Sequence, residues 1–571
     1  MKVLLTTLNA TYTHSCLALR CLAASAPRHK AHLVIKEFTI NNNADDILAT
    51  IFKAQPSVVC FSCYIWNITL TLALVDNLKK VLPNAKVILG GPEVSFNAAA
   101  VLAQCAADVV VSGEGEAVFA SLMVFFIDGE GALATIPNIT YRDKQGECVE
   151  TAKTSVLLDL NDLPFLYETG LGGLANKAIY YESSRGCPFR CAYCLSGADN
   201  QVRFLDLNRC FAELQFFLDQ SPKRVKFLDR TFNCKKSHAM AIWRYLIDHD
   251  NGVTNFHFEM AADLLDTDML ALLAQARPGL FQFEIGIQST HKPTLEAIGR
   301  QTDLQACFRH IRAIRDAGNV HLHVDLIAAL PLEGIEAFRE SFNAVYALSA
   351  NKVQLGFLKL LHGSALRAKA DDYGLVYRQK APYEVLFTPD LSFADVIRLK
   401  ELEEMLENYY NTKRLKWTLA FAVPLFESPF HFYDALAKAK NHESPQSKAR
   451  LYEDLYDFLC AQGVAEQVII GNLLAFDMLL KDRGVNPPNW LGTDMTESDK
   501  QAAKRFIRRF PGNESGKLNR WLHIQKFAYD IVPWVLGQTI EIMKRDNFIL
   551  FDYTGKACVF RTMEDSEWNV V

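Results

Sequence analysis

The first 125 residues alternate short apolar, β-branched runs with amphipathic stretches of helical period. Helical patterns, such as those at 15–26 and 68–81, separate the predicted strands. Apolar strands that alternate with helices are typical of a doubly wound parallel sheet with both faces covered. Ligands of such sheets bind beyond the carboxyl ends of the strands. The predicted strands cover 3–8, 32–39, 57–62, 86–89 and 108–111.

The same alternation begins again at residue 178, after a connector over 126–177 that holds a predicted hairpin at 138–150. Six βα units follow, which are too few for a closed eight-stranded barrel. The sequence therefore predicts an open, partial (β/α)6 barrel over 178–365, with its site at the carboxyl ends of the strands. Its predicted strands cover 179–184, 225–229, 256–261, 281–287, 322–327 and 353–358.

The pattern changes again over 366–571, where long stretches of helical period predict a mostly helical domain. A two-stranded ribbon is predicted at 527–531 and 548–553. The basic cluster at 504–509 fits a solvated helix face better than a phosphate-binding patch. The predicted fold class is thus α/β, with a doubly wound sheet over 1–125, a partial barrel and a helical C-terminal domain.

Composition excludes several classes of protein. The chain has 571 residues, of which 50% are hydrophobic, and a net charge of −5, so neither a disordered chain nor a nucleic-acid coat is indicated. Fourteen cysteines in a chain long enough to form several cores indicate free thiols rather than a disulfide framework. The N-terminus lacks the pattern of a signal peptide, and polar residues interrupt the apolar run at 58–75. We expect a cytoplasmic protein without a membrane span.

Glycines at the predicted strand ends indicate the kind of ligand. A dinucleotide-binding fold needs G-x-G-x-x-G directly after the first strand, but residues 9–14 contain no glycine. Glycines follow the fourth and fifth strands instead, which disfavours NAD and leaves room for another flat or bulky ligand. The candidate contacts at these strand ends are Asn9, Ser62, Tyr64, Gly90, Gly91, Glu93, Gly113 and Glu114.

Three cysteines follow the first predicted barrel strand with the spacing C-x3-C-x2-C: Cys187, Cys191 and Cys194. A zinc ribbon needs four ligands in two pairs, and the next residues supply none. Three thiolates on one loop suit a 4Fe-4S cluster with one iron free of protein ligands, and that iron can chelate an amine and a carboxylate. Packing in cores is predicted for four other cysteines: Cys16, Cys60, Cys148 and Cys307.

The cysteine loop, with Tyr193 between its last two thiols, resembles that of the radical S-adenosylmethionine (SAM) superfamily. The N-terminal segment, with its strand-end motifs at 90–93 and 112–116, resembles the cobalamin-binding domain fused to one branch of that superfamily. The C-terminal region resembles an uncharacterised extension carried by one subgroup. Barrel motifs that fit the same branch lie at 227–233, 283–289 and 325–331.

The resemblance implies three cofactors: a 4Fe-4S cluster, SAM and cobalamin. It also implies an external one-electron reductant, flavodoxin- or ferredoxin-like, and cleavage of SAM to methionine and a 5′-deoxyadenosyl radical. The cobalt-ligand motif D-x-H-x-x-G is missing, because His14 lacks the required aspartate and glycine. Cobalt would then have no histidine ligand from this motif. Loss of cobalamin by the domain is an alternative that stays open.

The resemblance further implies roles for barrel residues. Backbone near Tyr193 is expected to contact adenine, and Glu284, expected at the end of its strand, would face SAM. Pairing of Glu284 with a base inside the barrel is the alternative. Asp229, Asn233 and Gln288 are expected at similar strand-end positions as cofactor contacts, with turn or capping bonds as the alternative.

The leading prediction is a cobalamin-dependent radical SAM enzyme that transfers a methyl group to an unactivated carbon. Cyclisation or rearrangement is an alternative, because it needs the same cofactors and domains. An alternative of another class is a cobalamin- or redox-sensing iron–sulfur protein without catalysis, which predicts an effector domain with a basic recognition helix. The substrate stays unknown, and neither a membrane nor a nucleic acid is indicated as a partner.

Overall fold

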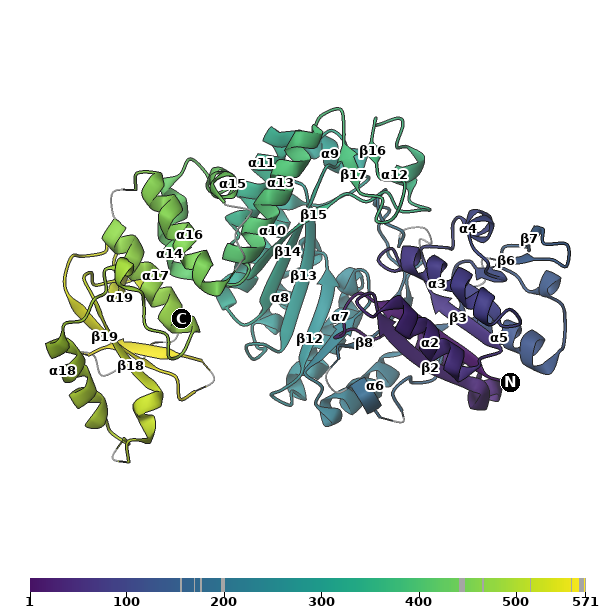
Figure 1. Cartoon of the computed structure of the whole chain (residues 1–571), viewed down its shortest axis with the longest axis horizontal. Helices are drawn as coiled ribbons and strands as arrows, with labels where there is room; N and C mark the ends of the chain where they lie inside the picture. The colour runs from purple at the N-terminus through teal and green to yellow at the C-terminus, as the bar shows by residue number, and fades with distance from the viewer. Residues whose placement is uncertain are drawn as a thin grey trace. The chain divides into compact units, whose positions relative to one another are not determined.

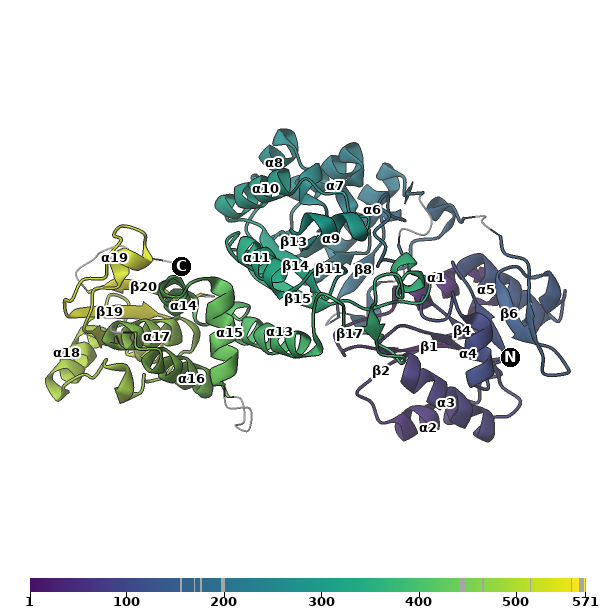
Figure 2. The ribbon, with the colours of Figure 1, turned by 90° about the horizontal axis from the view of Figure 1, so that it is seen from above.

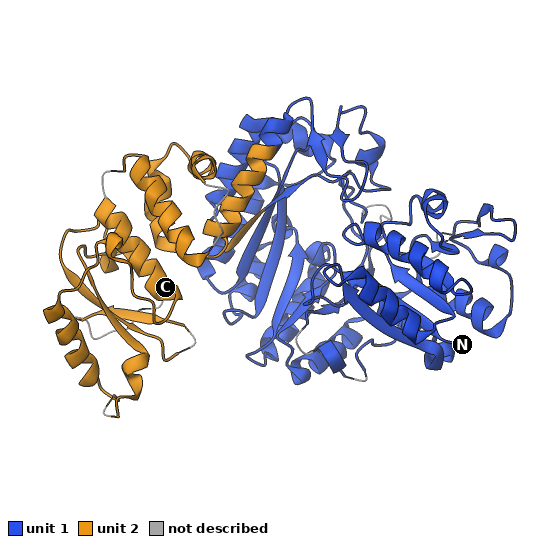
Figure 3. Ribbon diagram, in the orientation of Figure 1, with its two compact units in different colours: residues 1–350, 355–396 blue, residues 351–354, 397–571 orange. Residues whose placement is uncertain are grey.

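The chain forms two compact units in the computed structural model (Figure 3). Unit 1 comprises residues 1–350 and 355–396, and unit 2 comprises 351–354 and 397–571. Every site residue predicted above belongs to unit 1. The structure describes residues 1–154, 157–168, 170–174, 177–196, 201–440, 447–464, 467–513, 515–555, 557–563 and 569.

The N-terminal sheet has seven strands in the order β2-β1-β3-β4-β5-β6-β7. The first five strands are parallel and are connected by helices (Figure 1). The predicted hairpin is present as β6 and β7, and it extends this sheet antiparallel to β5. The strands are β1 (Val3–Asn9), β2 (Leu33–Thr39), β3 (Val58–Ser62), β4 (Lys86–Gly90), β5 (Val109–Val111), β6 (Ile139–Arg142) and β7 (Cys148–Glu150).

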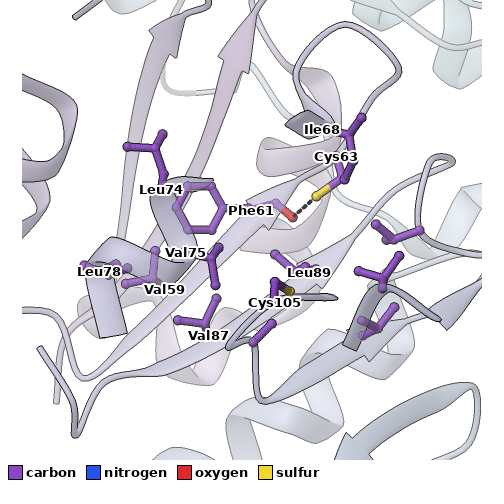
Figure 4. Packing of buried hydrophobic residues seen from close by; sticks show 14 of the residues in the cluster. Val59, Phe61, Cys63, Ile68, Leu74, Val75, Leu78, Val87, Leu89 and Cys105 are labelled. Carbon is purple, nitrogen blue, oxygen red and sulfur yellow. Dashed lines mark hydrogen bonds between the residues drawn. The ribbon is translucent and has the colours of Figure 1, made fainter. Parts of the chain in front are cut away.

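Helices cover both faces of this sheet, which confirms the predicted doubly wound fold. Successive side chains of a strand point to opposite faces, so β3 supplies Val59 and Phe61 to one core and Val58 and Cys60 to the other. Figure 4 shows the first core, to which α2, α3 and α4 contribute, whereas α1 and α5 pack on the second. These helices are α1 (Leu17–Ser25), α2 (Ala44–Ala54), α3 (Ile68–Val81), α4 (Ala98–Gln104) and α5 (Glu116–Met123).

The second sheet has six parallel strands in the order β15-β14-β13-β12-β11-β8 (Figures 1 and 2). The spatial order follows the chain order, as the predicted open barrel requires. Its strands are β8 (Ile179–Tyr181), β11 (Arg224–Phe227), β12 (Asn255–Met260), β13 (Phe281–Gln288), β14 (His321–Ala328) and β15 (Lys352–Phe357). The connecting helices include α6 (Leu207–Gln220), α7 (Lys236–Asp248), α8 (Thr267–Leu273), α9 (Lys292–Ala297), α10 (Leu304–Ala317) and α11 (Ile335–Tyr346).

Side chains of the barrel strands alternate between an apolar and a polar environment. In β13, Phe283 packs against Trp243 of α7, with ring centroids 5.7 Å apart. The neighbouring positions, Gln282 and Glu284, lie on the opposite, inner face of the sheet. The inner face is therefore polar, and it is the face that a partial barrel presents to its ligands.

The first barrel strand is shorter than predicted. β8 ends at Tyr181, and Ser184–Arg185 forms a separate strand, β9, antiparallel to β10 (Arg203–Phe204). A tertiary contact accounts for this, because the buried carboxylate of Asp229, which follows β11, accepts a 3.0 Å hydrogen bond from the backbone N–H of Ser183. This bond turns the chain away from the barrel sheet before the cysteines begin.

A connecting segment, residues 358–391, follows β15 and belongs to unit 1. The N–H of Leu358 donates to the carbonyl of Ala328 at 3.0 Å and so joins the segment to the end of β14. Two short strands of the segment pair with each other. Its elements are α12 (Ala365–Ala368), β16 (Val376–Tyr377) and β17 (Val385–Phe387).

Unit 2 is rich in helix, as predicted, but its sheet has three antiparallel strands instead of two. Most of the run 527–531, predicted as a strand, is the turn before α19 (Val532–Val535), where Pro533 favours the start of a helix. The strands are β18 (Leu522–Phe527), β19 (Asn547–Asp552) and β20 (Val559–Thr562). α13 (Phe393–Met405) begins in unit 1 and continues into unit 2. The other longer helices of unit 2 are α14 (Lys416–Ala422), α15 (Pro429–Ala439), α16 (Lys448–Ala461), α17 (Gln467–Lys481) and α18 (Glu497–Arg508).

The exposure of residues tests three further sequence predictions, on the basic cluster, on the packing cysteines and on a membrane span. α18 has no buried residue, so the basic cluster begins on a solvated helix, as predicted. Cys148 is exposed, because it lies on edge strand β7, so its prediction as a packing residue is wrong, whereas Cys16, Cys60 and Cys307 are buried. Among the described residues, no helix combines the length and the apolar character needed to span a bilayer.

Candidate functional site

The three cysteines lie on a loop that contacts the segments following β11 and β13. Cys187 is buried, and its sulfur lies 3.6 Å from the hydroxyl of Thr231. Cys191 and Cys194 are half-buried. Gly186 starts the loop with φ +105°, and a Cβ atom there would overlap the carbonyl oxygen of Gln201, so the turn requires glycine.

Backbone hydrogen bonds fix the cysteine loop from two sides. The N–H of Ala192 donates to Ile298 O at 2.8 Å, and its carbonyl accepts from the N–H of Leu366 at 2.7 Å. The N–H of Cys194 closes a turn onto Cys191 O at 3.0 Å. The protein itself therefore shapes the loop, which fits three thiolate ligands of one cluster.

Arg300 is a functional candidate that the sequence analysis missed. Its guanidinium lies 3.8 Å from Cys191 Sγ and 3.5 Å from the hydroxyl of Tyr193, and it also donates to the carbonyl of Gly286. Burial raises the pKa of Tyr193, which keeps its hydroxyl protonated. A cation beside a ligand sulfur offsets the negative charge of a thiolate-bound cluster.

Two of the predicted strand-end residues bind the protein's own chain. Asp229 is fully buried and accepts hydrogen bonds from Ser183 Oγ and Ser184 Oγ at 2.7 and 2.6 Å. Burial raises its pKa to about 6. Asn233 makes two hydrogen bonds with the backbone of Ala261, at 2.8 and 3.0 Å. Both contacts match the turn and capping alternative, and Asp229 holds the chain just before the cysteine loop.

Gln288 ends β13 with a left-handed backbone, at φ +71°. Its side chain folds over Gly286, where a Cβ atom would overlap the amide nitrogen of Gln288. Its Oε1 atom is buried and has no hydrogen-bond partner among the described residues. Leaving a buried acceptor unpaired costs about 1–3 kcal/mol, and a ligand that donates to Gln288 would remove this cost. This residue therefore fits a cofactor contact.

Glu284 lies in the middle of β13 rather than at its end, because the strand continues to Gln288. Its carboxylate is 3.2 Å from Lys226 Nζ and 3.0 Å from His257 Nε2. Burial opposes its ionisation, but the contacts with His257 and Lys226 outweigh burial and lower the pKa to about 2. Glu284 thus has the base partners that the alternative predicted.

Further charged residues of the inner face surround Glu284. Glu259 lies 3.4 Å from Lys226, and His323 lies 3.2 Å from Asp325. The ligating atoms of Glu284, His323 and Asp325 lie within 4.8 Å of one another. The ammonium of Lys226 within this group disfavours a metal ion there, because the two cations would repel each other. The group is better described as an ionic network that keeps the barrel interior polar.

A cavity of about 140 Å³ lies at the carboxyl ends of β3, β4 and β5, between the sheet and helices α1 and α5. No described atom lies within 4 Å of a Cβ position on Gly113, and a Cβ on Gly91 would lie 2.5 Å from Cys63 O. Glycine leaves open space at Gly113, which suits a flat ligand, whereas at Gly91 it is required by the close approach of the Cys63 backbone. Four predicted contacts line the cavity: Ser62, Gly90, Gly91 and Gly113.

The other four predicted contacts of this region bind protein groups and do not line the cavity. Two of them reach residues far along the chain and so join the strand-end loops to other parts of unit 1. The pairs are Asn9 with Glu37 (2.7 Å), Tyr64 with Trp66 (ring centroids 4.5 Å apart), Glu93 with Tyr383, and Glu114 with Arg203.

His14, the histidine without a ligand motif, also binds within the protein. Its Nδ1 atom makes a hydrogen bond with the hydroxyl of Tyr180 on β8. Burial and the nearby charge of Lys226 lower the pKa of His14. This bond joins the loop after β1 to the first strand of the barrel within unit 1.

Three family matches cover most of the chain. Residues 3–123 match the B12 binding domain, residues 181–345 match the radical SAM superfamily, and residues 371–551 match a family described as a protein of unknown function (DUF4080). The first two matches coincide with the glycine-lined cavity and with the barrel that carries the cysteine loop. They give the chain the cofactors of both domains: cobalamin, a 4Fe-4S cluster and SAM.

Curated relatives are distant. The cobalamin-dependent radical SAM methyltransferase TokK of Streptomyces tokunonensis is 26% identical over 366 residues, which cover 59% of this chain and 52% of TokK. The 2-(S-pantetheinyl)-carbapenam-3-carboxylate methyltransferase of Streptantibioticus cattleyicolor is 26% identical over 317 residues, 51% of this chain and 45% of that protein. The chain thus spans about half the length of these relatives.

Solved structures show the same fold. The radical SAM methyltransferase TsrM from Kitasatospora setae has a TM-score of 0.54 at 17% identity, over 67% of this chain and 76% of TsrM. The cobalamin-dependent SAM radical enzyme OxsB has a TM-score of 0.58 at 15% identity, over 84% of this chain and 79% of OxsB. With its B12-binding domain, radical SAM domain and DUF4080 region, the chain belongs to the cobalamin-dependent radical SAM enzymes.

Proposed function

We propose that this enzyme transfers a methyl group to an unactivated carbon of its substrate. The observation that supports joint use of the two cofactor sites is that the glycine-lined cavity and the cysteine loop belong to one compact unit. A methyl donor and a radical source must act on the same carbon, so their sites have to be held together. Two relatives at 26% identity are named methyltransferases, which supports this reaction.

Residues of the barrel would prepare the radical step. When bound, the cluster and SAM supply a 5′-deoxyadenosyl radical, and cobalamin supplies the methyl group. The thiolates of Cys187, Cys191 and Cys194 hold the cluster and leave one iron for SAM. Arg300 offsets negative charge beside Cys191. The buried carbonyl oxygen of Gln288 is available to a hydrogen-bond donor of SAM.

Residues of the N-terminal sheet would hold cobalamin. Gly90, Gly91 and Gly113 offer backbone to the face of the corrin ring, since no side chain holds the ring away from them. The cavity behind these glycines is lined mainly by apolar side chains of α1, α5 and the strands. Such a cavity suits the aromatic base of the nucleotide tail of cobalamin, because burial of apolar rings is favourable.

Cyclisation is the second candidate reaction. The anaerobic magnesium-protoporphyrin IX monomethyl ester cyclase of Synechocystis is 25% identical over 254 residues, 42% of this chain and 49% of that protein. A cyclase would use the radical to activate a carbon but would transfer no methyl group. The two reactions therefore differ in what becomes of the methyl group of SAM.

The fate of that methyl group provides the test. The holoenzyme, reconstituted anaerobically with cluster and hydroxocobalamin, is incubated with a flavodoxin reducing system and SAM that carries a trideuteromethyl group. Flavodoxin stands for the one-electron reductant that we propose as a partner. Methyl transfer predicts both 5′-deoxyadenosine and S-adenosylhomocysteine, with the label on cobalamin. Formation of 5′-deoxyadenosine alone, with no labelled cobalamin, would overturn methyl transfer and favour cyclisation.

A further inference from the structure

The connecting segment contacts the cluster loop as well as the barrel. Its N–H at Leu366 donates to the carbonyl of Ala192, between two of the cluster cysteines, at 2.7 Å. The hydroxyl of Tyr373 donates to Ala297 O at 3.4 Å, next to the loop that binds Ala192 from the other side. The segment therefore supports the cysteine loop directly.

The same segment also reaches the N-terminal sheet. The hydroxyl of Tyr383 donates to the carboxylate of Glu93, in the loop after β4, and both residues are buried. Ala381 packs against the hydrophobic core of the sheet. Phe96, three residues after Glu93, lies where a Cβ atom on Gly363 would stand. These contacts fall on the loop that begins with Gly91, at the glycine-lined cavity.

Arg367 stiffens the segment between these two ends. One of its terminal nitrogens donates to Leu360 O at 2.6 Å. Its guanidinium lies over the ring of Tyr383, 4.9 Å from the centroid, and over that of Tyr377 at 5.3 Å. Backbone bonds of 3.0 Å from Leu360 N to Tyr383 O and of 2.9 Å from Val385 N to Leu358 O hold the two arms of the segment together.

We propose that the connecting segment sets the spacing between the cobalamin site and the cluster, with Tyr383 as its positioning residue. The inference rests on the proposed function, because a set spacing matters only where both cofactors act on one substrate. A displacement of about 1 Å between reacting groups can lower a rate by ~100-fold. The bond from Tyr383 to Glu93 is one of the contacts that tie the loop after β4 to a segment already fixed at the cysteine loop.

Tyr383→Phe tests the proposal, with Tyr377→Phe as the matched control. Both changes remove one hydroxyl from a ring under Arg367, but the hydroxyl of Tyr377 makes no hydrogen bond among the described residues. In the holoenzyme with cob(II)alamin and a reduced cluster, pulsed EPR measures the dipolar coupling between the two paramagnets. We expect one narrow distribution of cobalt–cluster distances in the wild type and in Tyr377→Phe. We expect a broader distribution of these distances in Tyr383→Phe. Glu93→Gln keeps an acceptor oxygen and should retain the narrow distribution.

Hydrogen exchange gives a readout that needs no cofactor. Amides of residues 91–97 should exchange about tenfold faster in Tyr383→Phe, because a buried hydrogen bond contributes ~1.4 kcal/mol to holding this loop. Unchanged dipolar coupling or unchanged exchange in Tyr383→Phe would overturn the proposal. If the wild type binds no cobalamin, the proposed function fails, and the exchange measurement still decides whether Tyr383 anchors the loop.

Discussion

The hydroxyl of Ser184 donates a 2.6 Å hydrogen bond to the carboxylate of Asp229, which is fully buried. The same carboxylate accepts from the hydroxyl and the backbone N–H of Ser183, at 2.7 and 3.0 Å. Two neighbouring residues of the chain are thus bound to one acid beyond the end of β11. The turn into the cysteine loop depends on this acid.

Asp229→Ala is expected to lower the free energy of unfolding by about 2–4 kcal/mol, because it leaves three buried donors without their acceptor. Iron content after anaerobic reconstitution should fall with it, since the loop loses its fixed origin. Urea unfolding and iron assay measure both effects. Asp219→Ala is the control, because Asp219 lies on an exposed helix face, where it accepts a hydrogen bond from Gln215. Wild-type iron content in Asp229→Ala would contradict this role.

Replacement of any cluster cysteine by alanine should abolish reductive cleavage of SAM, because the three thiolates are the proposed protein ligand set. Iron and sulfide analysis, the visible spectrum and formation of 5′-deoxyadenosine provide the measurements. Cys148→Ala and Cys307→Ala serve as controls, since neither residue belongs to the cysteine loop or lines the glycine-lined cavity. A variant at Cys187, Cys191 or Cys194 that keeps wild-type iron and activity would remove that residue from the ligand set.

Gly90→Leu should weaken hydroxocobalamin binding about tenfold or more, a loss of ~1.4 kcal/mol, because its side chain would enter the glycine-lined cavity. Gly90 is preferred to Gly91 for this test because a side chain at Gly91 would also strain the backbone. At Gly91, φ is +110° and a Cβ would lie 2.5 Å from Cys63 O. The nearest atom to a Cβ on Gly90 is Val111 Cβ at 3.8 Å. Absorbance titration measures the affinity. Ala49→Leu, on an exposed position of α2, adds comparable bulk and should leave binding unchanged.

Glu333, a buried residue after β14 that accepts hydrogen bonds from the hydroxyls of Ser289 and Ser341, should make stability depend on pH. Burial raises the pKa of this carboxyl group to about 7 from a usual value of 4.5. The folded state therefore holds its proton more tightly, and this contribution is complete below about pH 4.5 and is lost as pH rises through about 7. Loss of this contribution lowers the free energy of unfolding by about 3 kcal/mol. Between pH 5 and pH 8, the free energy of unfolding should fall less in Glu333→Gln than in the wild type. Equal decreases in both proteins would contradict the prediction.

The cysteine loop and the strand-end glycines could be predicted, because each depends on residues that are close together in the sequence or on the order of strands along the chain. The three cysteines share one loop, and glycines at the ends of β4 and β5 must meet at one edge because the strands are parallel. The predicted strand over 281–287 already placed Glu284 near its middle, so the strand-end position that the resemblance implied did not fit that strand. Apolar residues at alternate positions continue to Ile287, but the strand end depends on pairing with β14.

Contacts between distant segments could not be predicted in the same way. The partners of Glu284 come from β11 and β12, so they depend on the register of three strands. Tyr383 lies 290 residues from Glu93 along the chain. No local pattern marks such a pair, because a tyrosine and a glutamate acquire their roles only when the loop and the segment meet.

Residues 371–396 match the family of unknown function in sequence but fold with the barrel. An exchange of C-terminal regions between relatives at residue 365 would replace both Tyr383, the partner of Glu93, and Leu366, whose backbone N–H donates to Ala192 O. An exchange after residue 396 would keep both bonds. The first part of this family match therefore contributes to the unit that holds both cofactor sites, whereas residues 397–551 belong to unit 2.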